Sequence, residues 1–264
     1  MENIYLRCRH YLIKRLHKII NLLRTPARGI YPFAYYNAQL EKKMVDEFVR
    51  DGAIWCNDGW EIKSICIDNL TVNGLIMEFG VYQGNSINYI ADRIEGEVHG
   101  FDGFQGLPDG RGPWASYVKR KAFDLKGKLP TVRSNVRLHQ GWFKDTLPAF
   151  LENHAEPARF IHVDCDVYSS TKTILTLLAD RIVPGTVILF DEYCNYDGWQ
   201  FEEYKAFQEF VNRHNVGYKV LAVDTYESEA NPFGKVAFLI KSITHQKNVS
   251  AAKSRQTQPS PVSV

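Results

Sequence analysis

The stretch from Leu75 to Ile94 constrains the fold of this chain more than any other. It opens with an apolar run, Leu75-Ile76-Met77, and continues with the segment Glu78-Phe79-Gly80-Val81-Tyr82-Gln83-Gly84-Asn85-Ser86. A run with helical periodicity, Ile87 to Ile94, follows. This order is strand, tight turn and helix, and glycines in such a turn let the backbone approach a ligand and direct N–H groups at a negative group. The stretch therefore predicts a strand of an α/β sheet with a ligand at its end.

A second strand-like run, Val98 to Phe101, ends in Asp102. A carboxylate at that place can accept hydrogen bonds from both hydroxyls of a ribose, as in dinucleotide-binding folds. Because of this carboxylate beside the glycine turn, we expect a nucleoside-containing cofactor here. The turn contains only Gly80 and Gly84, so it lacks the third glycine of the phosphate-binding G-x-G-x-x-G pattern. The alternative is an ordinary tight turn that binds nothing.

Strand-like and helix-like segments alternate from residue 74 onward. Strands are predicted at 74–79, 97–102, 135–139, 159–164, 186–191, 218–223 and 235–241, and helices at 84–94, 145–153, 170–181 and 199–214. Alternation of this kind is typical of an α/β, Rossmann-like fold. We expect a mostly parallel seven-stranded sheet with helices on both faces.

Three parts of the chain are distinguished by composition and pattern. Residues 1–70 form a predicted N-terminal helical extension, with helices at 4–24 and 38–50. Residues 71–241 form the predicted domain, and its insertion at 103–134 lacks periodicity, which favours a lid. Residues 242–264 are rich in Ser, Gln, Pro and Lys, which predicts a disordered tail.

Charge is distributed unevenly along the chain. Residues 1–28 hold seven Lys/Arg and one acid (+6), and residues 241–264 hold four Lys/Arg and no acid (+4). The total of +2 therefore leaves −8 on residues 29–240. An acidic body disfavours a nucleic-acid groove. The basic amphipathic helix at 4–24 either contacts an anionic membrane surface or packs on its own domain or on a second subunit of a homo-oligomer, and we favour packing.

The five cysteines, at positions 8, 56, 66, 165 and 194, form no C-x-x-C pair. A scattered, odd number favours reduced thiols in a cytoplasmic protein over a disulfide framework. No apolar run approaches the roughly 20 residues of a membrane span. Lys14, Arg15 and Lys18 interrupt the N-terminal apolar positions, which argues against a signal peptide. We expect a cytoplasmic protein, with peripheral membrane contact as the alternative.

Three carboxylates follow two of the predicted strands. Asp164 ends the run 160–163, and Asp191 and Glu192 end the run 187–190. Neighbouring parallel strands would bring the three together, and clustered carboxylates repel one another unless a cation lies between them. Oxygen ligands suit Mg²⁺, Mn²⁺ or Ca²⁺. We predict a metal site here, and the alternative roles are helix capping and hydrogen bonding to loop amides.

Two further side chains are candidates for chemistry. Asp166 is either another ligand or the cap of the helix predicted to start near Ser170, and we favour the cap. His139 ends the third strand and is either a functional group or an ordinary core residue. His162 lies within a strand, which is typical of a core histidine. Nothing in the sequence is similar to a Ser-His-Asp triad.

The chain resembles the class I S-adenosylmethionine-dependent O-methyltransferases of the macrocin O-methyltransferase (TylF/MycF) type. The resemblance extends from about residue 75 to 240 and rests on the order and spacing of six blocks. These are Glu78 to Ser86, Gly100-Phe101-Asp102-Gly103-Phe104-Gln105-Gly106-Leu107-Pro108, Gly141-Trp142-Phe143-Lys144-Asp145-Thr146-Leu147-Pro148, His162-Val163-Asp164-Cys165-Asp166-Val167-Tyr168-Ser169-Ser170-Thr171, Pro184-Gly185, and Phe190-Asp191-Glu192-Tyr193.

The resemblance implies a role for each matching residue. The cofactor, S-adenosyl-L-methionine, would contact Glu78, Gly80, Gly84, Ser86, Asp102, Phe104, Trp142, Phe143 and Asp164. The magnesium site would consist of Asp164, Asp191 and Glu192, and the catalytic residues would come from Asp164, Asp166 and His139. Relatives of this type methylate sugar hydroxyls on macrolides or related glycosides, so the expected acceptor is a small molecule or glycan hydroxyl under the predicted lid.

Two positions depart from related patterns. The family often has Asp where Glu192 stands, and catechol-type relatives have a lysine where Val167 stands. The proton acceptor therefore stays open between Asp166, His139 and a carboxylate-bound water. Alternatives to this function are a metal-independent methyltransferase, a Rossmann nucleotide-sugar or dinucleotide oxidoreductase, and a non-catalytic membrane adaptor.

Overall fold

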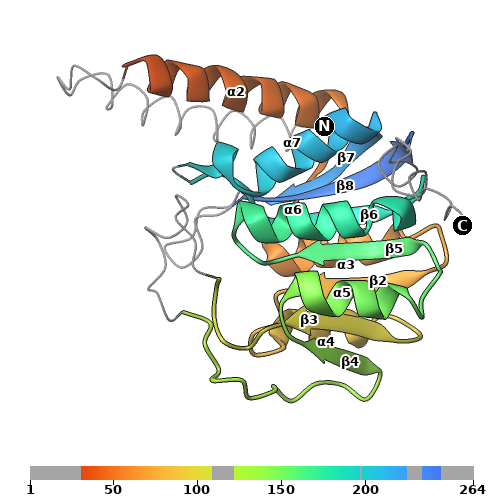
Figure 1. Cartoon of the computed structure of the whole chain (residues 1–264). Coiled ribbons are helices and arrows are strands. Elements are labelled where there is room, and N and C mark those ends of the chain that lie inside the picture. The colour runs from red at the N-terminus through yellow and green to blue at the C-terminus, as the bar shows by residue number, and fades with distance from the viewer. Residues whose placement is uncertain (1–30, 109–121, 197, 225–233, 245–264) are drawn as a thin grey trace, which may run out of the picture.

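The structure is a computed structural model that describes residues 31–108, 122–196, 198–224 and 234–244 (Figure 1). The predicted helix at 4–24, residues 109–121 of the predicted lid and most of the predicted tail lie outside the described residues. Among the described helices, none combines the length and apolar character that a membrane span needs.

One eight-stranded sheet, in the order β1-β7-β8-β6-β5-β2-β3-β4, forms the centre of the described part of the chain. Its strands are β1 (Ile54–Trp55), β2 (Leu75–Phe79), β3 (Val98–Asp102), β4 (Val136–Gln140), β5 (Ala158–Val163), β6 (Val187–Cys194), β7 (Gly217–Asp224) and β8 (Gly234–Ser242). The mostly parallel sheet is confirmed, and the seven predicted strands are all present. The expected number of seven was one too few, because β1 pairs with the edge of β7.

Strand β8 is the exception to parallel pairing, since it runs antiparallel between β6 and β7. The other described pairs are parallel. The carboxyl ends of β2, β3, β5 and β6 therefore meet at one edge of the sheet, and the first residues of β8 reach the same edge.

The helices are α2 (Tyr31–Arg50), α3 (Gly59–Asp68), α4 (Asn85–Ala91), α5 (Phe143–Leu151), α6 (Tyr168–Leu177) and α7 (Glu203–His214), with short 3₁₀ turns at Ala179–Arg181 and Trp199–Phe201. Helix α3 was not predicted. It begins at an N-cap, Asp58, whose side chain accepts hydrogen bonds from the backbone N–H groups of Trp60 and Glu61, each at 2.8 Å. Its short length and mixed composition give a weak periodic signal.

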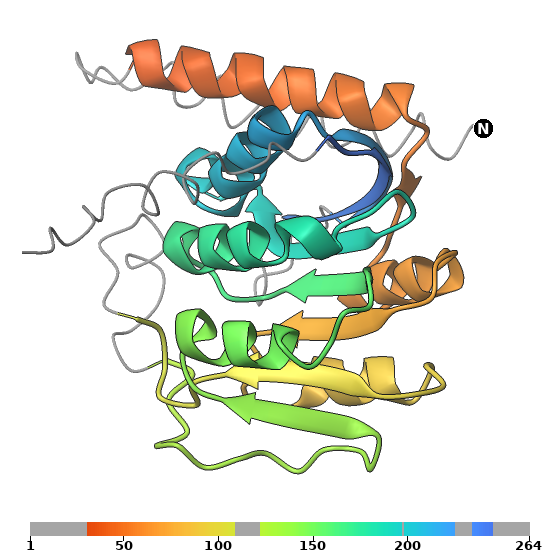
Figure 2. The same ribbon diagram turned by 45° about the vertical axis from the view of Figure 1, so that its right-hand side comes forward.

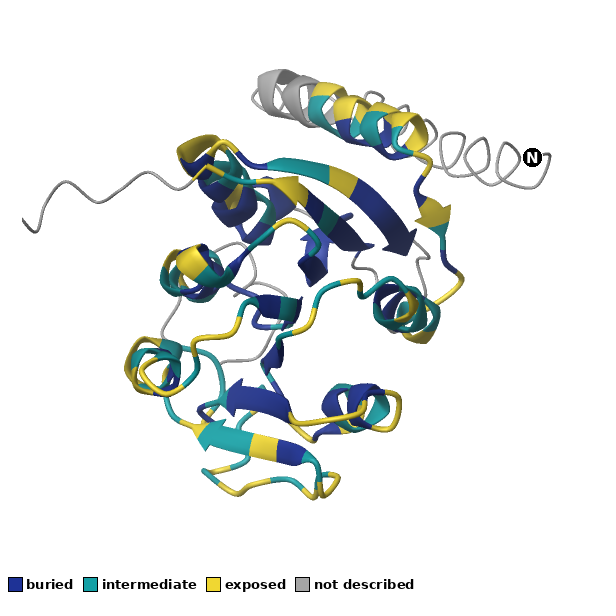
Figure 3. Cartoon of the chain, turned by 90° about the vertical axis from the view of Figure 1, so that its right-hand side faces the viewer, coloured by how far each residue is buried: buried dark blue, intermediate teal, exposed yellow. Residues whose placement is uncertain are grey.

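Two hydrophobic cores lie on the two faces of the sheet, as the alternation of strand side chains requires. One core contains residues of α2, α5, α6 and α7, such as Phe48, Phe150 and Phe207. The other contains residues of α3 and α4, such as Ile62 and Ile87. Figures 2 and 3 show the helices on both sides of the sheet and the buried residues along the strands. Helices therefore cover both faces, as predicted.

The segment before residue 70 packs on the same sheet. Met44, Val45 and Phe48 of α2 are buried, and α2 lies along the β7 side of the sheet (Figure 1). Helix α3 contacts β6, β7 and β8. Thus α3 brings its side chains close to the strand ends that carry the predicted metal ligands.

Candidate active site

The turn between β2 and α4 needs glycine at two positions. Gly80 has φ +95° and Gly84, the residue before α4, has φ +83°. A Cβ atom at Gly80 would lie 1.6 Å from the backbone oxygen of Asp164, which no adjustment of a side chain could relieve. The turn therefore packs its backbone directly against the residue that follows β5, and the predicted cofactor turn and the predicted metal ligand are neighbours.

Asp102, at the end of β3, holds this turn in place. Its Oδ2 accepts the backbone N–H groups of Val81 and Tyr82, each at 2.8 Å, and its Oδ1 accepts that of Phe104 at 2.7 Å. These hydrogen bonds tie the end of β3 to the end of β2. Asp102 also lines the cavity described next, so the same carboxylate is available to a ligand.

A cavity of about 580 Å³ opens at this edge of the sheet. Its wall includes six of the nine predicted cofactor residues, namely Gly80, Ser86, Asp102, Trp142, Phe143 and Asp164. Glu78, Gly84 and Phe104 are not among its lining residues. Phe104 is fully buried in the core on the α3/α4 face. Its backbone adopts φ +53°, and the side chain fills the core instead of bordering the cavity.

Glu78 is also fully buried, and its two oxygens have partners within the protein. The hydroxyl of Ser86 donates to Oε1 at 2.8 Å, and Nδ1 of His162 lies 2.9 Å from Oε2. These two hydrogen bonds of Glu78 connect β2 to β5 and to the first turn of α4. Ser86 is the member of this group that lines the cavity.

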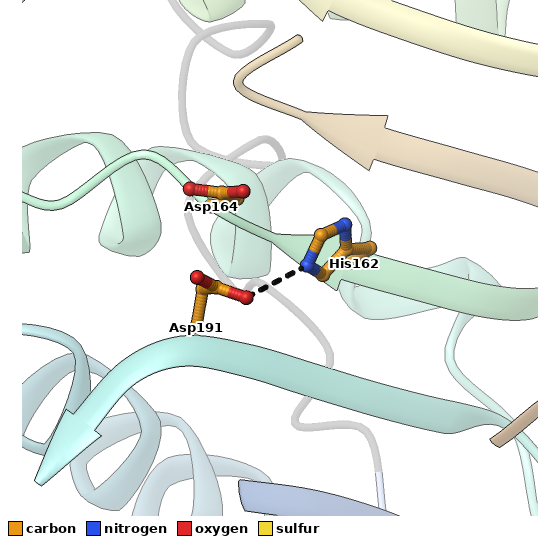
Figure 4. A group of neighbouring side chains, drawn as sticks. All are labelled: His162, Asp164 and Asp191. Atoms are coloured by element: carbon orange, nitrogen blue, oxygen red, sulfur yellow. Dashed lines mark hydrogen bonds and ion pairs between the residues drawn. The ribbon is translucent and has the colours of Figure 1, made fainter. Parts of the chain in front are cut away.

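His162 joins Glu78 to Asp191. Its Nε2 lies 3.3 Å from Oδ1 of Asp191, as Figure 4 shows. Burial lowers the pKa of His162, as does the ammonium group of Lys63, but the hydrogen bonds to Asp191 and Glu78 outweigh both and raise the pKa above its ordinary value. The imidazole therefore lies between two carboxylates, one on each neighbouring strand. His162 is thus a buried histidine with a partner at each ring nitrogen, which agrees with the expectation of a core residue.

Two lysines complete the surroundings of Asp191. Nζ of Lys63, from α3, lies 3.3 Å from Oδ1, and Nζ of Lys235, from β8, pairs with Oδ2. Both lysines are buried. Burial alone would raise the pKa of Asp191, but Lys235, Lys63 and His162 hold it well below its ordinary value. Sequence reasoning missed both lysines, because neither follows a parallel strand.

The three predicted metal ligands divide between two groups. One group is His162, Asp164 and Asp191, and the other is Asp164, Asp166 and Glu192; within each, the ligand atoms lie within 4.8 Å of one another. Asp191 and Glu192 separate because successive residues of a strand point to opposite faces, and β6 continues through both to Cys194.

Asp164, Asp166 and Glu192 form the acid group of this site. Burial and the nearby carboxylate of Asp191 raise the pKa of Asp164 to about 7. Burial, followed by Asp166, raises the pKa of Glu192 well above its ordinary value, and Oε2 of Glu192 is buried with no hydrogen-bond partner among the described residues. Both shifts reflect burial and the repulsion between neighbouring carboxylates.

Two neighbouring glutamates at the start of α7 accept backbone N–H groups of β6 and α6. Oε2 of the buried Glu203 accepts the backbone N–H of Glu192 at 3.0 Å. Oε2 of Glu202 accepts the backbone N–H of Tyr168, at the first residue of α6, at 2.7 Å. Glu202 therefore provides a cap for α6, the role that was expected of Asp166. Asp166 itself has φ +65° and lines the cavity.

His139 lies elsewhere. Its ring stacks on Phe101 with centroids 4.5 Å apart, and its Nε2 lies 3.3 Å from Nδ1 of His99. Burial, with a contribution from His154, lowers its pKa. These three histidines line a second depression beside β4 and none of them lines the main cavity. The structure does not bring His139 to the acid group.

Comparisons with known proteins support the assignment that the geometry suggests. Residues 77–193 match a family model described as a methyltransferase domain. The chain is 25% identical over 185 residues to mycinamicin III 3''-O-methyltransferase of Micromonospora griseorubida. This alignment covers 60% of this chain and 70% of the relative. It is 30% identical over 156 residues to a rhamnosyl-tetracenomycin-C 4'-O-methyltransferase of Streptomyces olivaceus, covering 48% of this chain and 57% of the relative.

Among solved structures, the O-methyltransferase NovP is similar with a TM-score of 0.49 and 21% identity, covering 69% of this chain and 79% of that one. The family model, the curated relatives and the glycine turn beside Asp102 point to one assignment. Residues 77–193 match a methyltransferase domain, and these similarities support a class I S-adenosylmethionine-dependent O-methyltransferase.

Proposed function

We propose that this chain transfers a methyl group from S-adenosylmethionine to a hydroxyl of a sugar or of a glycosylated small molecule. The observation that carries the proposal is a cavity lined both by the glycine turn with Asp102 and by Asp164 and Asp166 of the acid group. The names of two curated relatives support the acceptor class, since one is a 3''-O-methyltransferase of mycinamicin III and the other a 4'-O-methyltransferase of a dimethoxy-rhamnosyl tetracenomycin.

The cofactor end of the cavity is built from β2, β3 and the start of α5. Asp102 offers its carboxylate to the ribose hydroxyls, and the turn at Gly80 offers backbone groups to the methionine part. The exposed ring of Trp142 packs against Gly103, where a Cβ would lie 3.8 Å from the ring, so this pair offers a flat surface for adenine. When bound, S-adenosylmethionine supplies an activated methyl group, and the protein has to align and deprotonate the acceptor.

The acceptor end of the cavity combines aromatic rings with hydroxyl groups. Tyr82 and Phe123 pack edge to face with centroids 5.3 Å apart, and both are partly exposed at the cavity wall. Trp60 lies on the same wall, and α6 contributes the hydroxyl-bearing Ser169, Ser170 and Thr173. Apolar ring faces with a few polar groups suit a sugar ring, which has apolar C–H faces and hydroxyls at its edge.

Asp164, Asp166 and Glu192 fit a divalent cation. They offer oxygen ligands within 4.8 Å of one another, and the buried Oε2 of Glu192 has no protein partner among the described residues. When bound there, such a cation lowers the pKa of a coordinated hydroxyl and orients it. Asp164 and Glu192 belong to the predicted metal set, Asp166 was considered as a further ligand, and Asp191 belongs to the other possible group, with His162 and Asp164.

Asp166 is the better placed of the two predicted proton acceptors. It lines the cavity, whereas His139 lines the depression beside β4. A carboxylate has two oxygens, so one can bind a cation while the other receives the proton of the acceptor hydroxyl. Asp166→Asn is expected to lower turnover while S-adenosylhomocysteine binding is retained.

Methyl transfer from labelled S-adenosylmethionine to a panel of glycosides tests the proposal. We expect transfer to sugar hydroxyls, loss of transfer in EDTA and recovery with Mg²⁺ or Mn²⁺. Transfer that continues in EDTA and in Glu192→Gln would show a metal-independent enzyme. A thermal shift with NAD and none with S-adenosylhomocysteine would contradict the methyltransferase proposal itself.

A further inference from the structure

Two buried lysines hold Asp191, the middle residue of the Phe190-Asp191-Glu192 segment. Lys63 of α3 approaches one oxygen at 3.3 Å, and Lys235 of β8 pairs with the other. The exposed fractions of the two lysines are 5% and 4%, so bulk water does not replace these contacts. A buried ammonium group needs a charged partner, and Asp191 serves two of them.

The direction of Asp191 follows from its place in the strand. Leu189, two residues earlier, is buried in the core on the α3/α4 face, and strand side chains alternate. Asp191 therefore points to the α3/α4 face, where Lys63 lies. Glu192 points to the other face, where α7 begins. Beyond Phe190 the pairing of β6 with β8 shifts register before Cys194, so the direction of Glu192 rests on its place beside Asp164 and Asp166.

The approach of Lys235 depends on a glycine. A Cβ atom at Gly59, the first residue of α3, would lie 2.8 Å from Cε of Lys235. The missing side chain at Gly59 leaves room for the lysine to cross the start of the helix and reach Asp191. Gly59 does not have the positive φ that would strain an alanine. A Cβ there would contact only Lys235, so Gly59→Ala should displace that side chain and change little else.

Asp191 is also the end of a continuous polar network that begins at the cavity. Ser86, which lines the cavity, donates to Glu78; Glu78 contacts His162, and His162 contacts Asp191. Glu78, His162, Asp191 and Lys235 lie on β2, β5, β6 and β8, which are adjacent strands. The network crosses the sheet just beneath the cofactor turn.

A divalent cation on Asp191 would conflict with this arrangement, because it would place two further positive charges beside two buried ammonium groups. We propose that Lys63 and Lys235 commit Asp191 to the network, so that Asp191 positions the cofactor turn through His162 and Glu78 and is not a ligand of the cation. The statement that Asp191 is not a ligand rests on the proposed cation at Asp164, Asp166 and Glu192. The statement that Asp191 positions the cofactor turn does not depend on that cation.

Two titrations on the same variants test this. Mn²⁺ binding is followed by the electron paramagnetic resonance of the free ion, and S-adenosylhomocysteine binding by calorimetry. Asp191→Asn is expected to raise the dissociation constant of S-adenosylhomocysteine about tenfold, the scale of losing an outer-shell partner, and to change that of Mn²⁺ much less. Glu192→Gln is expected to show the reverse pattern.

The lysines provide the matched comparison. Lys235→Met should weaken S-adenosylhomocysteine binding as Asp191→Asn does, and Lys235→Arg should restore part of it, because the arginine keeps the charge. Gly59→Ala should have a weaker effect in the same direction. Lys172→Met removes an exposed ammonium group that pairs with Glu209 and should change neither titration.

Asp191→Asn leaves two buried lysines without their partner and could fail to fold. The double variant Asp191→Asn/Lys235→Met removes one charge of each sign and serves in its place. If either folded variant loses Mn²⁺ more strongly than S-adenosylhomocysteine, Asp191 is a ligand and the inference is overturned. Unchanged S-adenosylhomocysteine binding in both would also overturn it. Absence of Mn²⁺ binding by the unmodified protein would refute the proposed cation alone, and the S-adenosylhomocysteine titration would still decide the role of Asp191.

Discussion

Nδ1 of His162 lies 2.9 Å from Oε2 of Glu78, and both side chains are fully buried. The two residues are also direct partners in the parallel pairing of β2 and β5. This contact joins the strand that leads into the cofactor turn to the strand that leads to Asp164. The backbone of the turn then meets that of Asp164 at Gly80. The cofactor turn and Asp164 are therefore connected twice, through the contact between Glu78 and His162 and through the backbone contact at Gly80.

Gly80→Ala is expected to destabilise the protein far more than Gly96→Ala. Both glycines have positive φ, +95° and +104°, so both variants strain the backbone by roughly 1–2 kcal/mol. A Cβ at Gly96 meets nothing within 4 Å, whereas one at Gly80 meets the oxygen of Asp164. Urea unfolding should show an additional loss of about 2 kcal/mol or more for Gly80→Ala. Equal losses would show that the turn can move away from β5.

Asp102→Ala is expected to weaken S-adenosylhomocysteine binding by about 1.5–3 kcal/mol, the scale for hydrogen bonds to a charged group. The variant should also unfold more easily, because three backbone N–H groups lose their acceptor. Calorimetry and thermal unfolding measure the two effects. Asp145→Asn, at an exposed carboxylate of α5, is the control. An unchanged dissociation constant in Asp102→Ala would remove this residue from the cofactor site.

Glu192→Gln is expected to raise the melting temperature of the EDTA-treated protein, because it removes one of several buried carboxylates that repel one another. Mg²⁺ or Mn²⁺ should raise the melting temperature of the unmodified protein by roughly 5 °C at saturating concentration. The variant should lose that shift, and Glu152→Gln, at an exposed position, should keep it. A cation-induced shift of the same size in Glu192→Gln would exclude Glu192 as a ligand.

His99 is expected to make stability depend on pH in acid. Burial, with the charges of His139 and His154, lowers its pKa from 6.5 to about 4. In the unfolded chain His99 binds a proton below about pH 6.5, whereas in the folded chain it does so only below about pH 4. The contribution of neutral His99 to the free energy of unfolding is therefore complete above pH 6.5 and is lost as the pH falls toward 4. After allowance for solvent screening the loss amounts to roughly 1–2 kcal/mol. Urea unfolding of His99→Gln between pH 7 and 4 should show a correspondingly flatter profile, and an identical profile would contradict the assignment.

The arrangement of the sheet could be predicted because each strand is a short apolar run with turn residues on both sides. The edge at which the acids gather followed from the parallel order alone. The face to which each acid points did not follow, because it depends on where β6 ends. The prediction stopped that strand at residue 191, and the structure continues it to Cys194, so Asp191 and Glu192 alternate. The family resemblance also implied that Phe104 borders the cofactor, but the structure buries its side chain in the core, on a backbone with φ +53°.

The partners of Asp191 were missed for a different reason. Lys63 belongs to α3, whose short, mixed sequence gave no helical signal, and Lys235 stands at the beginning of a strand. In a parallel sheet the side chains at this edge come from residues that follow strands, whereas Lys235 of the antiparallel β8 lies at a strand start. Glu203 was missed because buried glutamates at a helix start look like ordinary exposed acids in a sequence.

The reversed direction of β8 has a consequence for how such a site can change over time. A parallel strand can contribute to this edge only through its last residues and the loop after them, whereas β8 contributes through its first residues. A substitution at Lys235 therefore changes no residue of the segments that form the cofactor turn or the acid group, and it acts on the turn only through Asp191. In related enzymes, a substitution at the start of β8 could change the charge beside Asp191 while the segments that form the cofactor turn and the acid group keep their sequence.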